Sequence, residues 1–292
     1  MKAFGAFLMR SRQNAMLSAF AFAFLPILHW LSAIIIALVT LRRGAKEGAL
    51  ILLSVLAPLA LLALFWKNSM AAYNATLAVT SVWLLAIILH DTHNWSVVLL
   101  VGAGLAILGI IVVHGYITDI NAWWQHRMLN YLQQMGADIP INMLRQKQTI
   151  TYLSKIATGM QAAVLLWLNL IWLLLARYWQ AILYNPGAFR AELHNISMPR
   201  WASLFSLVLL AMTLLLPVPL LIDLLPAAFL PFTFAAASLI HFILAARQAN
   251  GLWLVIFYVL LIFALPYVCV VLIILAWADS LINLRRYYQA SS

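Results

Sequence analysis

Charged residues are scarce in this sequence. Lys, Arg, Asp and Glu together make up only 8% of its 292 positions, whereas about a quarter is usual in a soluble domain. Hydrophobic residues fill 66% of the chain, and the mean hydropathy is +1.01. This balance excludes a water-soluble domain and predicts a polytopic membrane protein whose main surroundings are the lipid bilayer.

Cysteine and the motifs of common enzymes are also scarce or missing. The one cysteine, Cys269, lies in an apolar run and has no partner for an intrachain disulfide, so we expect it to serve packing. The chain has no nucleotide-binding lysine loop, no HExxH, no GxSxG, no pair of CxxC motifs and no Gly-rich dinucleotide turn. We therefore expect no catalysis, no cofactor and no bound metal.

The excess of positive charge, a net +10, does not indicate nucleic-acid binding. Lys and Arg stand singly at the ends of apolar runs and do not gather on one face. Contact with anionic lipid headgroups explains this distribution better, and we expect no nucleic-acid partner.

Apolar runs of about 20 residues match a hydrocarbon core about 30 Å thick, and the strict alternation of barrel strands is missing. The sequence therefore predicts an all-α fold, a single membrane helix bundle over residues 1–292. We expect about eight spans, four in residues 17–118 and four in 156–278: Leu17–Leu41, Gly48–Trp66, Met70–Leu89, Ser96–Thr118, Ile156–Ala176, Trp201–Ile222, Ala227–Ala246 and Leu252–Ala278.

A polar passage, Asp119–Lys155, separates the two groups of spans. Apolar residues recur every three or four positions from Ile120 to Met135, which indicates a helix with one apolar face. Gly136 is expected to end this helix, and Pro140 fits the first turn of a second one. We predict a helical hairpin with its bend between them.

Basic residues predict the orientation of the chain. With eight spans, both chain ends and the polar passage lie on one side, with ten Lys and Arg against seven on the other. The positive-inside rule then places both termini and the polar passage in the cytoplasm of a bacterium, with the spans in its inner membrane.

Several polar residues near the predicted spans have two interpretations. Asp119, Asp223 and Asp279 end spans on the side of the polar passage, where they form either a proton or cation relay or ordinary water-facing ends. The amides Gln161 and Asn169 either contact a ligand or join two helices. In both cases the second interpretation is favoured.

An external segment between the predicted fifth and sixth spans is distinctive. Residues 188–193, Ala-Phe-Arg-Ala-Glu-Leu, indicate a short amphipathic helix on the membrane surface, and residues 198–201, Met-Pro-Arg-Trp, lead into the next span. This segment and the order of the spans resemble the YybS-like family of uncharacterised bacterial membrane proteins. That family is similar to the substrate-binding S components of energy-coupling-factor transporters.

The resemblance implies a small helical bundle that captures a vitamin or metal ion from outside. It also implies docking on a partner membrane protein, the T component, through small residues of the first helix. Ala15, Ala19 and Ala23 have the small-xxx-small spacing of such a face. The chain departs from that pattern, because about eight predicted spans exceed the usual six and the polar hairpin is additional.

The first hypothesis for function is an integral inner-membrane protein that binds or helps to move a small solute, as an S component does. Arg190, Glu192 and His241 are the candidate ligand-binding residues, because a charged solute in a low-dielectric pocket needs complementary charges. His29, His114 and His241, within or near the membrane, each either bind a solute or are bonded to a helix-end carbonyl, and the second interpretation is favoured.

The alternative, from another class, is a membrane scaffold or assembly protein whose cytoplasmic hairpin docks a protein partner. Trp123 and Trp124, with His126 and Arg127, would form the contact surface, because Trp and Arg dominate interface hot spots. Anchoring of both Trp side chains at the level of the lipid headgroups explains the pair as well and is favoured.

Overall fold

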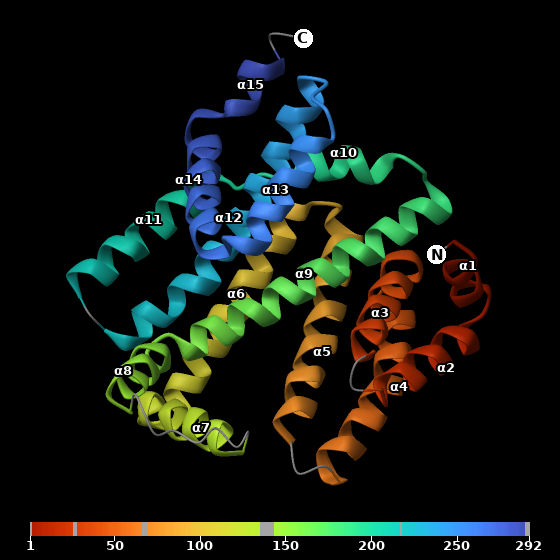
Figure 1. The fold of residues 1–292 in the computed structure, drawn as a ribbon. Coiled ribbons are helices and arrows are strands. Elements are labelled where there is room, and N and C mark those ends of the chain that lie inside the picture. The colour runs from red at the N-terminus through yellow and green to blue at the C-terminus, as the bar shows by residue number, and fades with distance from the viewer. Residues whose placement is uncertain (1, 26–27, 66–68, 135–142, 217, 290–292) are drawn as a thin grey trace.

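The computed structural model describes residues 2–25, 28–65, 69–134, 143–216 and 218–289 of the chain. In this described part all regular structure is α-helical, which confirms the predicted all-α fold (Figure 1). The helices are α1 (Lys2–Arg10), α2 (Arg12–Ala23), α3 (His29–Arg43), α4 (Ala45–Phe65), α5 (Ser69–Thr92), α6 (Trp95–Tyr116), α7 (Ile120–Gln134), α8 (Met143–Ser154), α9 (Ala157–Tyr184), α10 (Ala188–His194), α11 (Arg200–Leu215), α12 (Pro219–Ala246), α13 (Leu252–Phe263), α14 (Leu265–Ile282) and α15 (Leu284–Gln289).

Six of the described helices are long and apolar enough to cross a bilayer: α4, residues 71–92 of α5, α6, α9, α12 and α14. The shortest of them, α14, has 18 residues, and at 1.5 Å per residue it is about 27 Å long. Within such a helix the backbone N–H and C=O groups pair internally, as a lipid environment demands. The chain is therefore an integral, multi-pass membrane protein, with six candidate spans where about eight were predicted.

The first predicted span, Leu17–Leu41, is two helices. α2 and α3 run antiparallel, since the Ser32 hydroxyl donates to the Ala19 carbonyl at 2.7 Å and the Arg43 guanidinium donates to the Met9 carbonyl at 2.7 Å. With 15 residues, α3 is about 22 Å long and too short to cross a core of about 30 Å. The pair therefore enters the bundle and returns to the face from which it came.

The most continuously buried of the described helices is α3. Its side chains are buried without a break from Ser32 to Leu41, against α2, α4, α5 and α9. A helix that is apolar on all sides is stable where other helices or lipid cover all of it. Hydropathy marks this segment as strongly as a lipid-facing span, which is why the sequence predicts one crossing there.

The last predicted span, Leu252–Ala278, is also two helices, α13 and α14. The helix breaks at Ala264, whose φ of −125° and ψ of 34° are not helical, and Pro266 lies in the first turn of α14. In Figure 1 the two helices lie side by side, with their outer ends at the same end of the bundle. With 12 residues, α13 is about 18 Å long and does not cross.

One face of the bundle carries both described ends of the chain, and we call it the N-terminal face. Arg12 donates through Nε to the Glu47 carboxylate at 2.9 Å, which ties α2 to α4. His90 and Gln180 both bond to the Leu41 carbonyl, at 3.1 and 2.9 Å, and so bring the ends of α5 and α9 to the end of α3.

The N-terminal face continues through α10 to the last helices. Arg177, near the end of α9, donates through Nε to the Glu192 carboxylate of α10 at 2.8 Å. Arg285 of α15 donates to the Ile196 carbonyl at 2.7 Å and, through Nε, to the Asp279 carboxylate at 3.0 Å. Asp279 therefore lies on this face, and the prediction that it shares the side of the polar passage is wrong.

The polar passage contains two helices, α7 and α8, at the opposite face (Figure 1). They pack together, with the Gln125 amide donating to the Ser154 hydroxyl at 3.3 Å, and the predicted bend at residues 136–140 lies outside the described residues. The prediction that this passage shares a face with the chain ends is wrong. Because α2 and α3 return to their starting face, only three crossings, α4, α5 and α6, separate α1 from α7.

Candidate functional site

The candidate site lies where α6, α9 and α12 meet, beside α7. The predicted spans Trp201–Ile222 and Ala227–Ala246 leave Asp223 in a connection between them. Instead α12 begins at Pro219, so Asp223 lies in the second turn of a 28-residue helix. Proline in the first helical turn favours this early start. The Asp223 side chain is consequently inside the bundle, where it is 1% exposed.

Both carboxylate oxygens of Asp223 have partners. Oδ1 accepts the backbone N–H of Gly159 at 3.0 Å, and Oδ2 lies 2.7 Å from Nε2 of His114. Gly159 is the third residue of α9, and the N–H groups of a first turn have no acceptor within their own helix. Asp223 thus caps α9 from α12, at the positive end of the α9 dipole.

Gly159 is required at its position because a side chain would not fit. A Cβ added there would lie 1.9 Å from the backbone carbonyl oxygen of Asp223. The helices α9 and α12 thus approach backbone to backbone, as small residues permit in membrane bundles. This approach holds the N–H group and the carboxylate at bonding distance.

His114 completes the site from the last turn of α6. Its side chain is 13% exposed, whereas that of Asp223 is 1% exposed. A carboxylate inside a lipid-embedded bundle is costly unless it is paired, and residues of this kind often mark the pathways of solutes and protons. We call His114 and Asp223 the buried pair.

Helix α7 lies directly beside the buried pair. The Trp124 indole donates to the hydroxyl of Thr158, the residue before Gly159, at 2.8 Å. Trp123 packs edge-on against Trp124 with ring centroids 4.9 Å apart, and the Arg127 guanidinium lies 5.2 Å from the Trp123 ring. Both Trp side chains are half-buried, so they join α7 to the bundle and present only part of their surface to a partner.

The amides that the sequence singled out in the fifth predicted span join helices. Gln161 donates to the Asn74 side-chain carbonyl at 3.0 Å, and Asn169 donates to the Ser81 hydroxyl at 2.6 Å. Both bonds link α9 to α5, as the favoured interpretation of these amides expects.

The predicted ligand-binding residues lie on the N-terminal face, away from the buried pair. Arg190 is exposed on α10, and Nε2 of His241 lies 2.8 Å from the hydroxyl of Tyr258. The structure thus brings Arg190 and His241 to one face. Glu192, the third predicted ligand-binding residue, is instead bonded to Arg177.

The small residues predicted to dock a partner are inside the molecule. Ala15, Ala19 and Ala23 are 1%, 0% and 1% exposed and form the face of α2 that packs in the core, with Ser32 of α3 bonded to the Ala19 carbonyl. In this arrangement the stripe joins helices of the same chain and is not accessible to another protein.

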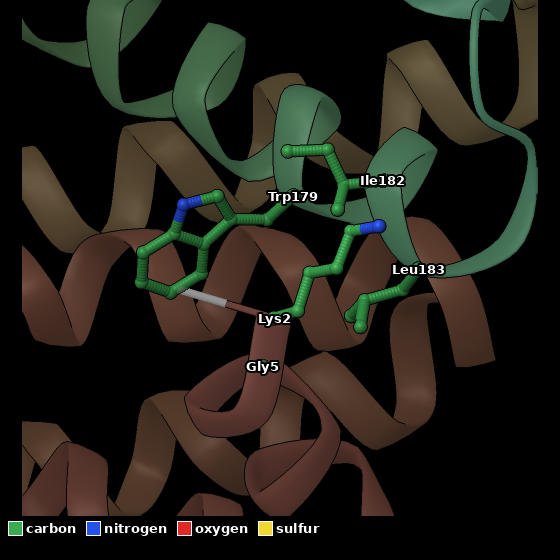
Figure 2. A pocket seen from close by; sticks show the side chains of 5 residues that line it. All are labelled: Lys2, Gly5, Trp179, Ile182 and Leu183. Carbon is green, nitrogen blue, oxygen red and sulfur yellow. The ribbon is translucent and has the colours of Figure 1, made fainter.

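A shallow pocket lies between α1 and α9 (Figure 2). It is lined by Lys2, Gly5, Trp179, Ile182 and Leu183 and has an empty volume of about 180 Å³. Apolar side chains make up most of its wall, so the pocket lacks the convergent polar groups that fix a polar solute. Among the described residues, no group of three or more His, Cys, Asp or Glu could hold a metal ion.

Comparisons of the chain with protein-family models, with curated proteins and with solved structures gave no match. The site therefore stands on the geometry of its own residues. In the sequence, His114 and Asp223 are separate candidates. Their contact joins positions 109 residues apart, so no local spacing indicates that they meet. Gly159 carries no signal in the sequence beyond its small size at the start of a span.

Proposed function

We propose that this chain is an integral protein of the bacterial inner membrane that binds a small solute and helps to move it across the bilayer, with no catalysis of its own. One observation carries the proposal: the buried pair of Asp223 and His114 lies inside the helix bundle, next to α7. A paired carboxylate at such a site is typical of pathways for solutes, ions and protons.

The chemistry of the buried pair favours a solute with a cationic group. Asp223 is held through Oδ1 by the N–H of Gly159, so Oδ2 can exchange His114 for an ammonium group or another cation. Exchange of one hydrogen-bond donor for another keeps the buried carboxylate paired, whereas a solute without a donor would leave Oδ2 without a partner.

The distribution of basic residues supports a site in the outer half of the membrane. The positive-inside rule puts the N-terminal face, with twelve of the 17 Lys and Arg, in the cytoplasm. The termini are then cytoplasmic, while α7, α8 and the buried pair face outward. The twelve residues are Lys2, Arg10, Arg12, Arg42, Arg43, Lys46, Arg177, Arg190, Arg200, Arg247, Arg285 and Arg286.

The resemblance to S components supports the same function. The six candidate spans among the described residues equal the number that is usual in those proteins. A site in the outer half of the membrane suits capture of a solute from outside. Helices α7 and α8 remain an addition to that pattern.

Native mass spectrometry of the gently solubilised protein tests the proposal by recording the small molecules that co-purify. Asp223→Asn keeps an oxygen for the Gly159 N–H but removes the charge, so we expect it to lose a stoichiometric small molecule that the wild type carries. Asp91→Asn, which changes an exposed acid at the end of α5, is the matched control and should retain the molecule. A wild type with no bound molecule, or equal retention in both variants, would argue against the proposal.

The scaffold alternative has a separate observation in its favour. Helices α7 and α8 expose large side chains outside the candidate spans, among them Leu129, Tyr131 and Tyr152, which are 40%, 62% and 71% exposed. Under this alternative these side chains, together with the outer parts of Trp123 and Trp124, form the contact surface. A protein partner that is lost from a Tyr131→Ser, Tyr152→Ser double variant, with no small molecule in the wild type, would favour the scaffold.

A further inference from the structure

We propose that Arg190, His194 and His241, with the hydroxyl of Tyr258, bind a phosphate group at the N-terminal face, and that the headgroup of an anionic phospholipid supplies it. The four side chains come from three elements, α10, α12 and α13. The proposal does not depend on the buried pair, which lies at the opposite face. We call these four residues the basic cluster.

Helix α10 positions two members of the basic cluster. Gly187, with a φ of +96°, precedes this helix in a conformation that favours glycine. Arg190 and His194 are four residues apart and therefore lie on one side of the helix. The ring of His194 is in edge-on contact with Phe242, with centroids 6.4 Å apart, so this side faces α12.

The other two members come from α12 and α13. His241 precedes Phe242, and its Nε2 lies 2.8 Å from the Tyr258 hydroxyl, with the two ring centroids 5.9 Å apart. Tyr258 is 44% exposed, so this polar pair is open to its surroundings. His241 is next to Phe242, whose ring the His194 ring contacts, and Arg190 lies one turn before His194 on α10, so the three side chains come to the same part of the face.

Within the described residues, no carboxylate neutralises the basic cluster. Glu192, the acid closest to it in sequence, is bonded to Arg177, and Asp279 is bonded to Arg285. Arg190 has no ion pair in the described part of the chain. Arg190 therefore carries a positive charge that an anion would stabilise, and the histidines and the tyrosine hydroxyl supply further hydrogen-bond donors.

Positive charges lie close to His194. The pKa of His194 is lowered from its usual 6.5, first by burial and then by the positive charges of Arg190 and Arg285. A bound phosphate would oppose this effect, because a nearby negative charge favours the imidazolium form.

The hydrogen-bond donors of the basic cluster match a phosphate group, and the exposed apolar side chains beside the cluster match the acyl chains of a lipid. A guanidinium fork, imidazole N–H groups and a phenol O–H all donate to phosphate oxygens. Beside the basic cluster, α13 has no buried residue and exposes apolar side chains, among them Trp253, Ile256 and Val259. The acyl chains of a phospholipid can lie along α13 while its headgroup reaches the cluster, as basic sites between helices allow on the cytoplasmic side.

The test uses the full chain in detergent micelles that contain equal amounts of phosphatidylglycerol and of diacylglycerol with the same acyl chains. Native mass spectrometry then counts each bound lipid. We expect the wild type to prefer phosphatidylglycerol, and Arg190→Gln to bind it about tenfold more weakly, the effect of one lost charge-assisted hydrogen bond. His194→Gln should weaken binding in the same direction. Arg200→Gln changes an exposed Arg of the same face and should bind as the wild type does.

Inorganic phosphate separates the two sources of the phosphate group. If a phospholipid headgroup supplies the phosphate group, millimolar inorganic phosphate leaves the bound phosphatidylglycerol in place. For a free phosphate-bearing solute, it displaces that lipid and raises the melting temperature of the wild type but not of Arg190→Gln. Equal retention of both lipids with no response to phosphate would overturn the site, as would equal losses in Arg190→Gln and Arg200→Gln. The melting temperatures of the two variants show whether each is folded.

Discussion

At the scale of single residues, the buried pair depends on a position that has no side chain. A Cβ at residue 159 would lie 1.9 Å from the Asp223 carbonyl oxygen, so α9 and α12 would have to separate. We expect Gly159→Ala to destabilise the protein by about 1–3 kcal/mol, the usual effect of overpacking, and to lower the melting temperature of the solubilised chain.

The matched control for Gly159→Ala is Gly104→Ala in α6, where no heavy atom lies within 4 Å of the added Cβ. Alanine is the better helix former, so this variant should melt at the wild-type temperature or above it. Equal melting temperatures for the two variants would contradict the close approach of α9 and α12.

His194 makes the stability of the N-terminal face depend on pH. Its pKa is lowered from 6.5 by burial and by Arg190 and Arg285, and His241 faces it from α12. Below pH 6.5 the unfolded chain protonates His194 more readily than the native state does, so stability falls as the pH falls through this value. Above pH 6.5 His194 is mostly neutral in both states and contributes no pH dependence.

The expected result is that the melting temperature of the wild type falls more than that of His194→Gln between about pH 7.5 and about pH 5.5. The variant keeps a polar side chain of similar reach but cannot titrate. Equal pH dependence in the two proteins would contradict the role assigned to His194.

At the scale of helices, the sequence predicted where apolar segments lie but not where the chain reverses. The predicted spans Gly48–Trp66 and Ser96–Thr118 agree with α4 and α6, because a helix that crosses lipid must be apolar over its whole length. Leu17–Leu41 and Leu252–Ala278 are also apolar, yet each contains two helices, of which α2 and α3 in the first and α13 in the second are too short to cross. Hydropathy indicates only that a segment avoids water. A helix that crosses lipid and a helix that is buried among other helices are both apolar, so hydropathy does not distinguish them.

Long-range contacts explain the other differences between predicted and observed helices. Helix α9 continues beyond Ala176, the predicted end of its span, to Tyr184, and Arg177, the first charged residue after that span, is bonded to Glu192 of α10. The contact between His114 and Asp223 is of the same kind. Such contacts join residues far apart in sequence, so local pattern and propensity do not reveal them.

The pairing of α2 with α3 predicts the effect of filling the small-residue stripe of α2. Ala19 is fully buried against α3, so Ala19→Leu should overpack the pair and lower the melting temperature, with a cost of about 1–3 kcal/mol. Leu17→Ala, at a position that is 69% exposed on the same helix, should have little effect. A normally stable Ala19→Leu protein would instead favour a stripe that is free to dock a partner.

At the scale of the whole molecule, the two faces differ in charge and in the chemistry they hold. The N-terminal face carries most of the Lys and Arg and the basic cluster, while the opposite face carries the buried pair and the polar helices α7 and α8. A protein that binds a solute near one face and lipid headgroups at the other needs the two binding sites to remain on opposite sides of the membrane. The orientation in the membrane then decides which compartment each site meets.

Labelling of single cysteines in intact cells tests this orientation. In a Cys269→Ala background, Gln13→Cys marks the N-terminal face and Ala122→Cys marks α7, and both positions are exposed. We expect a membrane-impermeant maleimide to label Ala122→Cys alone, and both after the cells are opened. Labelling of both positions from outside would contradict the opposite placement of the two faces, and labelling of Gln13→Cys alone would reverse the orientation.

The burial of α3 by other helices has a consequence for the synthesis of the chain. Three of the helices that bury it, α4, α5 and α9, follow it in the sequence, and at about 5–20 residues per second α9 leaves the ribosome roughly ten seconds later. Before these helices are synthesised, α2 is the neighbour already present, and it covers one side of α3 through the contact at Ser32. The pairing of α2 with α3 thus covers part of this apolar segment until the later helices are synthesised.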